Sequence, residues 1–417
     1  MAPSVFPSSN VEQCPMNQVA TIIRTGNSVE GEATGDEFGY SVSISANGMT
    51  LAVGGIWNDE NGSDSGHVRI FNLNSQNKWI QIGADIDGLS AGDEFGTSVS
   101  LSNNGNRLAV SSPGNDNDNG TNAGCARVFE RNGSGWIQIG SDILGLAAYD
   151  QLSQVALSGD GNTLAVSMPL NDDNGNDSGK VQIFAFIEYE WTKVGNNDDM
   201  TGSNKADQFG LYGLAISTDG MTVAAGSDYG NYVKVYTLVD GGWSLLGNVI
   251  NGQSGEWFGY SVDLSDNGRR LIIGAPFSSS KRGRVVMFDY VNDSDGDNWV
   301  TVGEPLYGGN FIDGFGDHIG VSVSISGSGN RIAVGGHYND ANGSNAGHVR
   351  VFDLSFDGDS NSWNQVDKDI LGQSAGDKSG WRVALSNDAK FLAVGEVGRN
   401  FNSGGARVFE MKCQSEE

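Results

Sequence analysis

The sequence has 417 residues and a formal net charge of −27, from 51 acidic and 24 basic side chains. This charge argues against nucleic acid or an anionic membrane as the main partner, because like charges repel. No apolar run approaches the roughly 20 residues that a membrane-spanning helix needs, so we expect no insertion into a membrane.

The first predicted element is a strand within residues 17–34. Residues 35–39 then read Gly-Asp-Glu-Phe-Gly, and related motifs begin near residues 92, 149, 206, 255, 316 and 376. The unit recurs every 49–61 residues and contains only strand and turn signals, which is typical of a propeller blade. We therefore predict an all-β fold: a single domain over residues 1–417, forming a seven-bladed β-propeller with four-stranded antiparallel blades.

Each repeat shows four strand signals, as in the first repeat. Strand A is predicted at residues 39–45, and an Asn47-Gly48 turn, a strong hairpin signal, joins it to strand B at 50–54. Strand C follows at 67–71. Strand D begins at a tryptophan in six repeats, and we expect these indoles to pack one blade on the next. They are Trp79, Trp136, Trp191, Trp243, Trp299 and Trp363.

A basic residue recurs in strand C between two apolar residues, so its side chain lies on the opposite face of the strand. We expect these residues to pair with carboxylates of a neighbouring strand or blade rather than to form a basic binding ring. They are Arg69, Arg127, Lys234, Arg350 and Arg407.

The last repeat ends after strand C, since only eight residues follow Phe409. We predict that the N-terminal strand supplies the missing strand D, which closes the ring and removes both sheet edges. Cys14 and Cys413 flank this junction. They either form a disulfide that locks the ring or are two unrelated thiols, and the sequence leaves both open. Cys125 is expected to be an ordinary buried thiol.

The repeats resemble the FG-GAP repeats of integrin-α-type β-propellers and their bacterial relatives. The resemblance rests on Phe38-Gly39, on the strand at residues 51–54, on the Gly-x-Val-x-Ile-Phe pattern at 66–71 and on Gly274-Ala275-Pro276. It extends over essentially the whole chain and implies extracellular adhesion and protein recognition. The calcium loop of that family is not carried over, because residues 45–48 are too short and too poor in carboxylates to coordinate the ion.

The loops between strands B and C are rich in Asn, Asp and Gly in repeats one, two, three and six. Such residues form turns through hydrogen bonds from side chain to main chain. A divalent cation such as Ca²⁺ is an alternative at Asp116 and Asp118, or at Asp172 and Asp173, although no glutamate completes the ligand set. No other cofactor or metal is predicted.

Repeats four and five have shorter B–C loops, and they lie next to each other in a ring. We predict a low sector there that binds a partner, because aromatic side chains beside basic ones are typical of interfaces. The candidate residues are Tyr229, Tyr232, Trp257, Phe277, Lys281 and Arg282.

The four histidines are scattered, and none lies in a known catalytic motif. We therefore expect no enzyme. The function predicted is an extracellular or cell-surface recognition module for a protein partner, and a glycan-binding propeller is the alternative. Asn-x-Ser/Thr sequons support that location, although no intact signal peptide begins the chain. They lie at Asn61, Asn119, Asn132, Asn176, Asn292 and Asn342.

Overall fold

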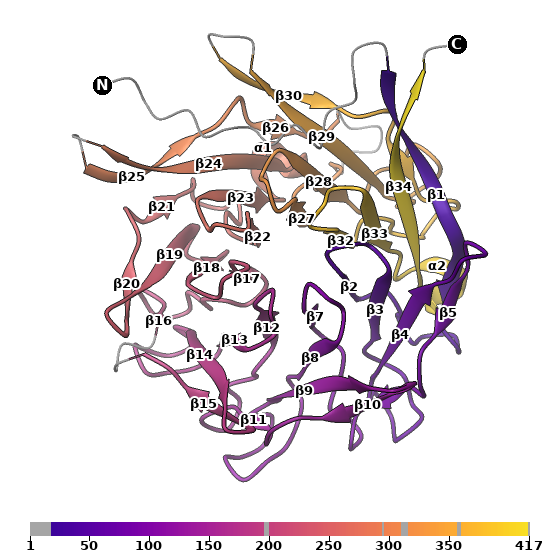
Figure 1. Cartoon of the computed structure of the whole chain (residues 1–417). Coiled ribbons are helices and arrows are strands. Elements are labelled where there is room, and N and C mark those ends of the chain that lie inside the picture. The colour runs from indigo at the N-terminus through magenta and orange to yellow at the C-terminus, as the bar shows by residue number, and fades with distance from the viewer. Residues whose placement is uncertain (1–17, 196–199, 294–295, 310–315, 357–359, 416–417) are drawn as a thin grey trace.

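Seven antiparallel sheets, one for each repeat, follow one another around a ring in the computed structural model (Figure 1). The structure describes residues 18–195, 200–293, 296–309, 316–356 and 360–415. The predicted seven-bladed β-propeller is therefore confirmed, with strand A of each blade innermost and strand D outermost.

The strands recur in the same order in every blade. The strands A are β2 (Ser41–Ile44), β7 (Val99–Leu101), β12 (Gln154–Leu157), β17 (Leu214–Ile216), β22 (Ser261–Leu264), β27 (Ser322–Ile325) and β32 (Arg382–Leu385). The strands B are β3 (Thr50–Gly55), β8 (Arg107–Ser112), β13 (Thr163–Met168), β18 (Thr222–Ser227), β23 (Arg270–Ala275), β28 (Arg331–Gly336) and β33 (Phe391–Gly395). The strands C are β4 (His67–Leu73), β9 (Cys125–Asn132), β14 (Lys180–Ile187), β19 (Tyr232–Val239), β24 (Arg284–Asp293), β29 (His348–Phe356) and β34 (Gly405–Ser415).

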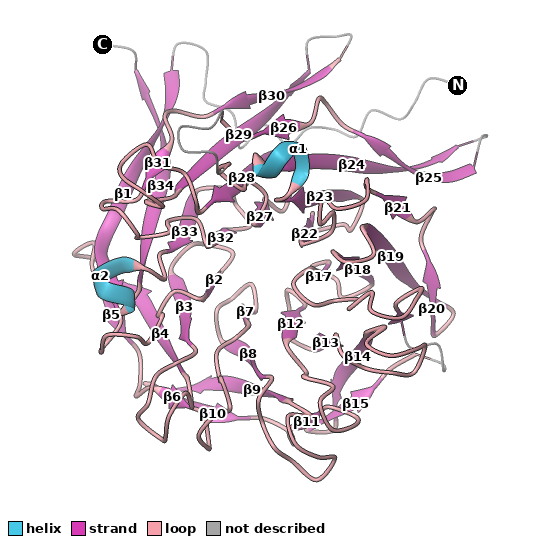
Figure 2. Ribbon diagram, turned by 180° about the vertical axis from the view of Figure 1, so that it is seen from behind, coloured by secondary structure: helices cyan, strands magenta, loops and turns pink. Residues whose placement is uncertain are grey.

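Strand D is interrupted in the first six blades, and both of its parts pair with strand C. The first parts are β5 (Trp79–Gln81), β10 (Gly135–Gln138), β15 (Glu190–Lys193), β20 (Gly242–Leu245), β25 (Gly296–Thr301) and β30 (Asn361–Gln365). The second parts are β6 (Ile86–Asp87), β11 (Ile143–Leu144), β16 (Met200–Thr201), β21 (Ile250–Asn251), β26 (Leu306–Tyr307) and β31 (Ile370–Leu371). Two single helical turns, α1 (Ser278–Lys281) and α2 (Arg399–Asn402), lie in the B–C loops of blades five and seven (Figure 2).

The seventh blade takes its strand D from the other end of the chain. Strand β1 (Gln18–Glu30) pairs with β34, from Gln18 opposite Ser415 to Glu30 opposite Gly405 (Figure 1). The predicted closure of the ring is confirmed. Cys413 is disulfide-bonded, but its predicted partner Cys14 lies outside the described residues, so that pairing stays a prediction. Cys125 is a buried free thiol.

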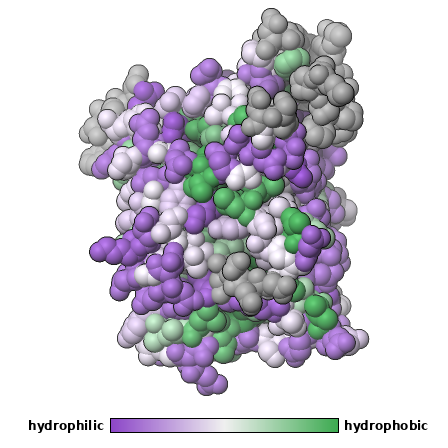
Figure 3. Space-filling view, turned by 90° about the vertical axis from the view of Figure 1, so that its left-hand side faces the viewer, coloured by the Kyte–Doolittle hydropathy of each residue, from purple (hydrophilic) through white to green (hydrophobic). Residues whose placement is uncertain are grey.

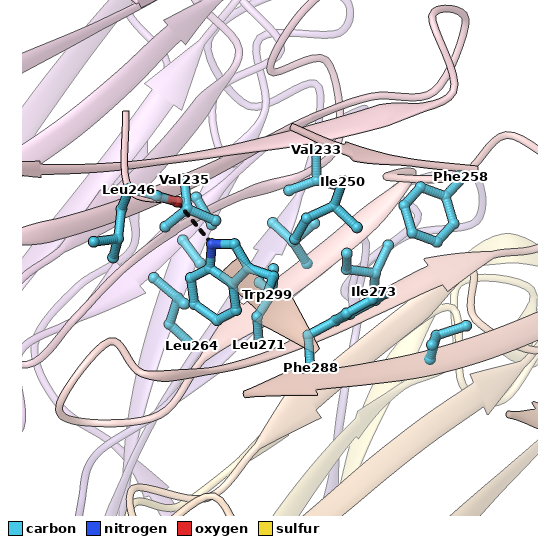
Figure 4. Close-up of a cluster of buried hydrophobic side chains, with 14 of the residues drawn as sticks. Val233, Val235, Leu246, Ile250, Phe258, Leu264, Leu271, Ile273, Phe288 and Trp299 are labelled. Atoms are coloured by element: carbon cyan, nitrogen blue, oxygen red, sulfur yellow. Dashed lines mark hydrogen bonds between the residues drawn. The ribbon is translucent and has the colours of Figure 1, made fainter. Parts of the chain in front are cut away.

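The hydrophobic core is divided into clusters, each between two adjacent blades. Figure 4 shows the cluster between blades four and five, where Trp299 and Phe258 lie among aliphatic side chains. The indole Nε1 of Trp299 donates a hydrogen bond to the carbonyl of Leu246 at 2.8 Å, across the blade boundary. The predicted packing of tryptophans from blade to blade is thus correct.

Glycines with positive φ make room for these indoles. A Cβ added at Gly140, where φ is +69°, would lie 2.6 Å from Cδ1 of Trp191 in the next blade. The same relation links Gly26 with Trp79, Gly195 with Trp243, Gly247 with Trp299 and Gly303 with Trp363.

We expect Gly140→Ala to lower the free energy of unfolding by about 1–3 kcal/mol more than Gly133→Ala, because only the former also overpacks the blade boundary. Gly133 is the matched control, since its φ is +63° and an added Cβ would meet nothing within 4 Å. Urea denaturation of both variants measures the difference, and equal losses would show that the indole contact does not matter.

The A–B turns form a second connection between blades, which we call the turn belt. The turn of each blade donates a backbone N–H to a carbonyl in the turn of the next blade at 2.8–3.3 Å. The bonds run from Ala46 to Asn103, Asn103 to Gly159, Gly159 to Thr218, Thr218 to Asp266, Asp266 to Gly327, Gly327 to Asn387 and, from the neighbouring Asp388, back to Ala46. The belt is therefore closed.

The basic residues of strand C serve the blades themselves. The prediction of carboxylate partners is correct for Arg69 with Asp85 at 3.7 Å and Arg350 with Asp369 at 3.0 Å. Arg407 likewise pairs with Glu396. It is wrong for two others, which lie over the ring of the motif phenylalanine instead: Arg127 over Phe95 and Lys234 over Phe209.

Candidate functional site

The B–C and D–A loops emerge on one face of the ring, and aromatic side chains gather there near the ring axis. Each contacts at least one other ring of the set, and together they span blades four, five, six, seven and one. We call this set the aromatic arc: Tyr40, Tyr212, Tyr229, Trp257, Tyr260, Phe277, His318, His337, Tyr338 and Trp381.

Blades four and five contribute one half of the arc. Tyr212 and Tyr260 stack with ring centroids 4.4 Å apart. Trp257 lies 6.0 Å from Tyr260, 5.9 Å from Tyr229 and 3.8 Å from Phe277. These rings form one continuous cluster across two blades.

The other half continues through blade six to blades seven and one. Phe277 contacts His318 at 4.8 Å, and His318 contacts His337 at 5.9 Å. His337 lies 5.0 Å from Trp381, which lies 5.7 Å from Tyr40. The rim of the ring differs: in the side view of Figure 3, apolar residues form separate patches among hydrophilic ones.

The repeat motif itself positions several of these rings. Trp257 and His318 follow the acidic residue of the motif and have left-handed φ values of 55° and 54°. Tyr40, Tyr260 and Trp381 follow the last glycine of the motif and directly precede the innermost strands of their blades. The turn that contains the repeat motif therefore supplies aromatic rings to the arc in blades one, five, six and seven.

Two ionisable residues stand where other blades have apolar ones. Just after strand B, five blades have an apolar residue, namely Ile56, Pro113, Pro169, Pro276 or Val397. The other two blades have Asp228 and His337 at this position. Burial raises the pKa of Asp228 to about 7 and lowers the pKa of His337 well below its usual range. Among the described atoms, Asp228 Oδ2 and His337 Nδ1 have no hydrogen-bond partner.

We expect Asp228→Asn to change how stability depends on pH. The folded-state pKa of Asp228 lies above the value of about 3.9 in an unfolded chain. The folded protein therefore keeps a proton that the unfolded chain loses between roughly pH 4 and 7, and wild-type stability falls as pH rises through this window.

The Asn variant lacks this fall, so it should gain roughly 3 kcal/mol relative to wild type between pH 4 and pH 8. Urea unfolding at several pH values measures the gain, with Asp240→Asn in an exposed C–D turn as the control. Parallel pH profiles for wild type and Asp228→Asn would contradict the prediction.

The structure brings three of the predicted partner-binding residues together, namely Tyr229, Trp257 and Phe277. Tyr232 is buried, and its hydroxyl donates to Asp207 at 2.7 Å. Lys281 is exposed, with Nζ 5.9 Å from the centroid of the Phe277 ring.

Arg282 donates to the carbonyls of Gly308 and Gly309, so its guanidinium holds a loop of the same face. Sequence reasoning missed the other members of the arc. A signal was present in the aromatic residue that follows the motif glycine in repeats one, five and seven.

The carboxylates proposed for a cation hold their own loops. Asp116 and Asp172 each accept a backbone N–H from within the loop, at 2.8 Å. Asp173 pairs with Lys180, and Asp118 is exposed. None of these residues belongs to a metal-binding group among the described residues.

Two such groups do occur, in blade one: Glu32, His67 and Asp85, and Glu60, Asp85 and Asp87. Arg69 lies 3.7 Å from carboxylate oxygens of both Glu32 and Asp85, so a positive charge already occupies this place.

Three of the sequon asparagines use their amide nitrogen to join the B–C loop to the D–A loop. Asn61 donates to Gly88 at 2.9 Å, and Asn119 and Asn342 each donate to the corresponding glycine at 2.7 Å. Asn132, Asn176 and Asn292 are exposed, and Asn176 donates to Asp177. Glycosylation stays a prediction at all six.

The fold and its repeated motif define the class: a seven-bladed β-propeller built from Gly-Asp-x-Phe-Gly repeats. Residues 30–71 and 86–129 match the FG-GAP repeat, so blades one and two carry FG-GAP repeats and the predicted resemblance is confirmed. A search of curated proteins finds no match for the chain. Among the described residues, no helix has the length and apolar character needed to cross a bilayer.

Solved structures share the fold at low sequence identity. Hydrazine synthase from Kuenenia stuttgartiensis is 13% identical, with a TM-score of 0.56 over 94% of this chain and 98% of that one. A putative 6-phosphogluconolactonase from Bacteroides uniformis is 11% identical, with a TM-score of 0.54 over 93% and 91%. The periplasmic gluconolactonase of Pseudomonas aeruginosa is 15% identical, with a TM-score of 0.53 over 86% and 96%.

These neighbours correct one prediction. We expected no enzyme because the sequence shows no catalytic motif, yet proteins named as lactonases have this architecture. A propeller can build a catalytic site from loop residues of several blades, which no short motif reveals. The fold therefore gives no ground for excluding catalysis.

Proposed function

We propose that this propeller is a recognition module that binds carbohydrate at the aromatic arc. The observation that carries the proposal is the unbroken series of ring contacts from Tyr212 to Tyr40 on one face. Sugars present flat C–H faces, and the electron-rich faces of aromatic rings favour such groups.

Polar groups beside the rings support this assignment. His318 Nε2, His337 Nδ1, Trp381 Nε1 and Asp228 Oδ2 have no hydrogen-bond partner among the described atoms. Each unsatisfied group costs about 1–3 kcal/mol, so natural folds keep few of them without a reason. A ligand with many hydroxyl groups could form hydrogen bonds with these four polar atoms.

A protein partner is the second candidate, and it would make the chain an adhesion module. The same loop face carries large apolar side chains that are exposed, in both its B–C and its D–A loops: Trp57, Leu89, Leu146, Tyr149, Tyr229 and Phe401. Phe401 is 88% exposed. Apolar side chains gathered on one face are typical of protein interfaces.

An extracellular or cell-surface location is part of the proposal. It is supported by the disulfide at Cys413, because disulfides persist in oxidising compartments. Non-reducing peptide mapping of the protein from its native source tests both the location and the pairing with Cys14.

A glycan array with the purified chain tests the carbohydrate assignment, with Trp257→Ala as the control protein. Binding that the variant loses supports the proposal. If no glycan on the array binds, and a single protein from the native cell surface binds at the aromatic arc, the ligand is a protein and not a carbohydrate.

A further inference from the structure

One arginine of the innermost strands has no acidic partner among the described residues. Arg382 is the first residue of β32 and pairs with Gly395. The same register holds serine in blades one, five and six: Ser41, Ser261 and Ser322. The guanidinium is therefore a feature of blade seven and not of the repeat.

Most arginines of this acidic protein form ion pairs with carboxylates. Within the described residues eight do so: Arg69, Arg107, Arg270, Arg284, Arg331, Arg350, Arg399 and Arg407. Arg382 forms none with a carboxylate of the described residues, and its bond there is from Nη1 to the carbonyl of Trp381 at 3.2 Å. Since a guanidinium has five N–H donors, most of them stay available.

The positive charge of Arg382 acts on three tyrosines from other blades, and one of them, Tyr40, contacts the neighbouring Trp381 at 5.7 Å. Burial raises the pKa of Tyr40, Tyr212 and Tyr260, and the charge of Arg382 opposes the rise at each of them. These phenols belong to blades one, four and five, so they can all be near Arg382 only at the axis. Their hydroxyls have no hydrogen-bond partner among the described residues and are free to donate.

The carboxyl groups whose charge acts on these phenols are Glu37, Glu94 and Asp228. Burial raises the pKa of all three, so each is protonated more readily than an exposed carboxyl. With its pKa raised to about 7, Asp228 is partly protonated at neutral pH, so this carboxyl opposes an added anion less.

We propose that Arg382 and the hydroxyls of Tyr40, Tyr212 and Tyr260 bind the carboxylate of an acidic saccharide whose sugar ring stacks on Trp381. The planar guanidinium matches a carboxylate with two parallel hydrogen bonds. Trp381 and Arg382 are consecutive, which sets an aromatic face beside the charge. A uronic acid carries its carboxylate directly on the sugar ring. A single sugar unit can therefore stack on Trp381 and place its carboxylate at Arg382.

This inference rests on the proposed carbohydrate function and specifies its ligand. The test is a titration of the full chain with D-glucuronate and with D-glucose, followed by tryptophan fluorescence and by saturation-transfer NMR. Glucuronate should bind at least tenfold more tightly than glucose, because the two differ only in the carboxylate. Arg382→Gln should remove that difference.

Arg131→Gln is the matched control, since Arg131 lies at a C–D turn on the other face; it should keep the tenfold preference. Melting temperatures of all variants show whether they fold. Equal binding of both sugars by wild type, or an undiminished preference in Arg382→Gln, would overturn the inference while the carbohydrate function stands. A third outcome is that wild type binds a hexaglutamate peptide but neither sugar, and that Arg382→Gln loses the peptide. This result would overturn both the inference and the carbohydrate function.

Discussion

Removal of residues 1–26 should lower the melting temperature sharply and promote aggregation. The deletion takes away most of β1, leaves β34 as an exposed sheet edge and removes the Thr25 carbonyl that accepts the hydrogen bond of the Trp79 indole. An exposed edge pairs readily with other chains. Differential scanning calorimetry and light scattering measure the two effects.

A shorter deletion separates the strand from the disulfide. Removal of residues 1–17 keeps β1 but eliminates Cys14, and should cost on the order of 5 kcal/mol if Cys14 and Cys413 are linked, because the loop they close is very long. Cys413→Ser should give the same loss. If the 1–26 deletion melts together with the full-length chain, the ring does not depend on β1.

Trp257→Ala and Tyr229→Ala should each weaken ligand binding by roughly 2 kcal/mol or more, the threshold for a dominant interface residue. Trp257 contacts three other rings of the aromatic arc, and Tyr229 is 53% exposed beside it. Isothermal titration with the ligand found on the array, or with the captured partner, measures the loss.

Tyr189→Ala is the control, because Tyr189 is 87% exposed but lies in a C–D turn on the opposite face. It should bind as wild type does. Trp257→Phe should retain part of the affinity, which distinguishes a lost ring face from a disturbed turn. Normal binding by both alanine variants, with loss of binding in Asp116→Ala, would place the site on the acidic loops instead.

The fold could be predicted because each blade repeats the same local signals. The Asn47-Gly48 turn, the alternation in strands A to C and the tryptophan at strand D are each readable within a few residues. Closure of the ring could also be predicted, because the N-terminus has one strand too many and the last repeat lacks its strand D. The interruption of strand D was missed, because Gly83 and its equivalents look like ordinary loop residues.

The aromatic arc could be predicted from the sequence only where its residues lie in adjacent loops, as do Tyr229, Trp257 and Phe277. Tyr40 and Trp381 are far apart in sequence and meet only because the ring closes between blades seven and one. Tyr232 was misplaced because its side chain turns inward to Asp207, which alternation in a short strand does not reveal. Contacts across the axis depend on the number of blades and their tilt, not on any local pattern.

The turn belt has no first or last member, because every blade both donates to one neighbour and accepts from the other. The first and last described residues are also adjacent, with Gln18 opposite Ser415. The order in which the blades are connected is therefore not what holds them together. Joining the two ends and opening the chain at a C–D turn of another blade would preserve every bond of the belt, so circular permutation should leave the architecture intact.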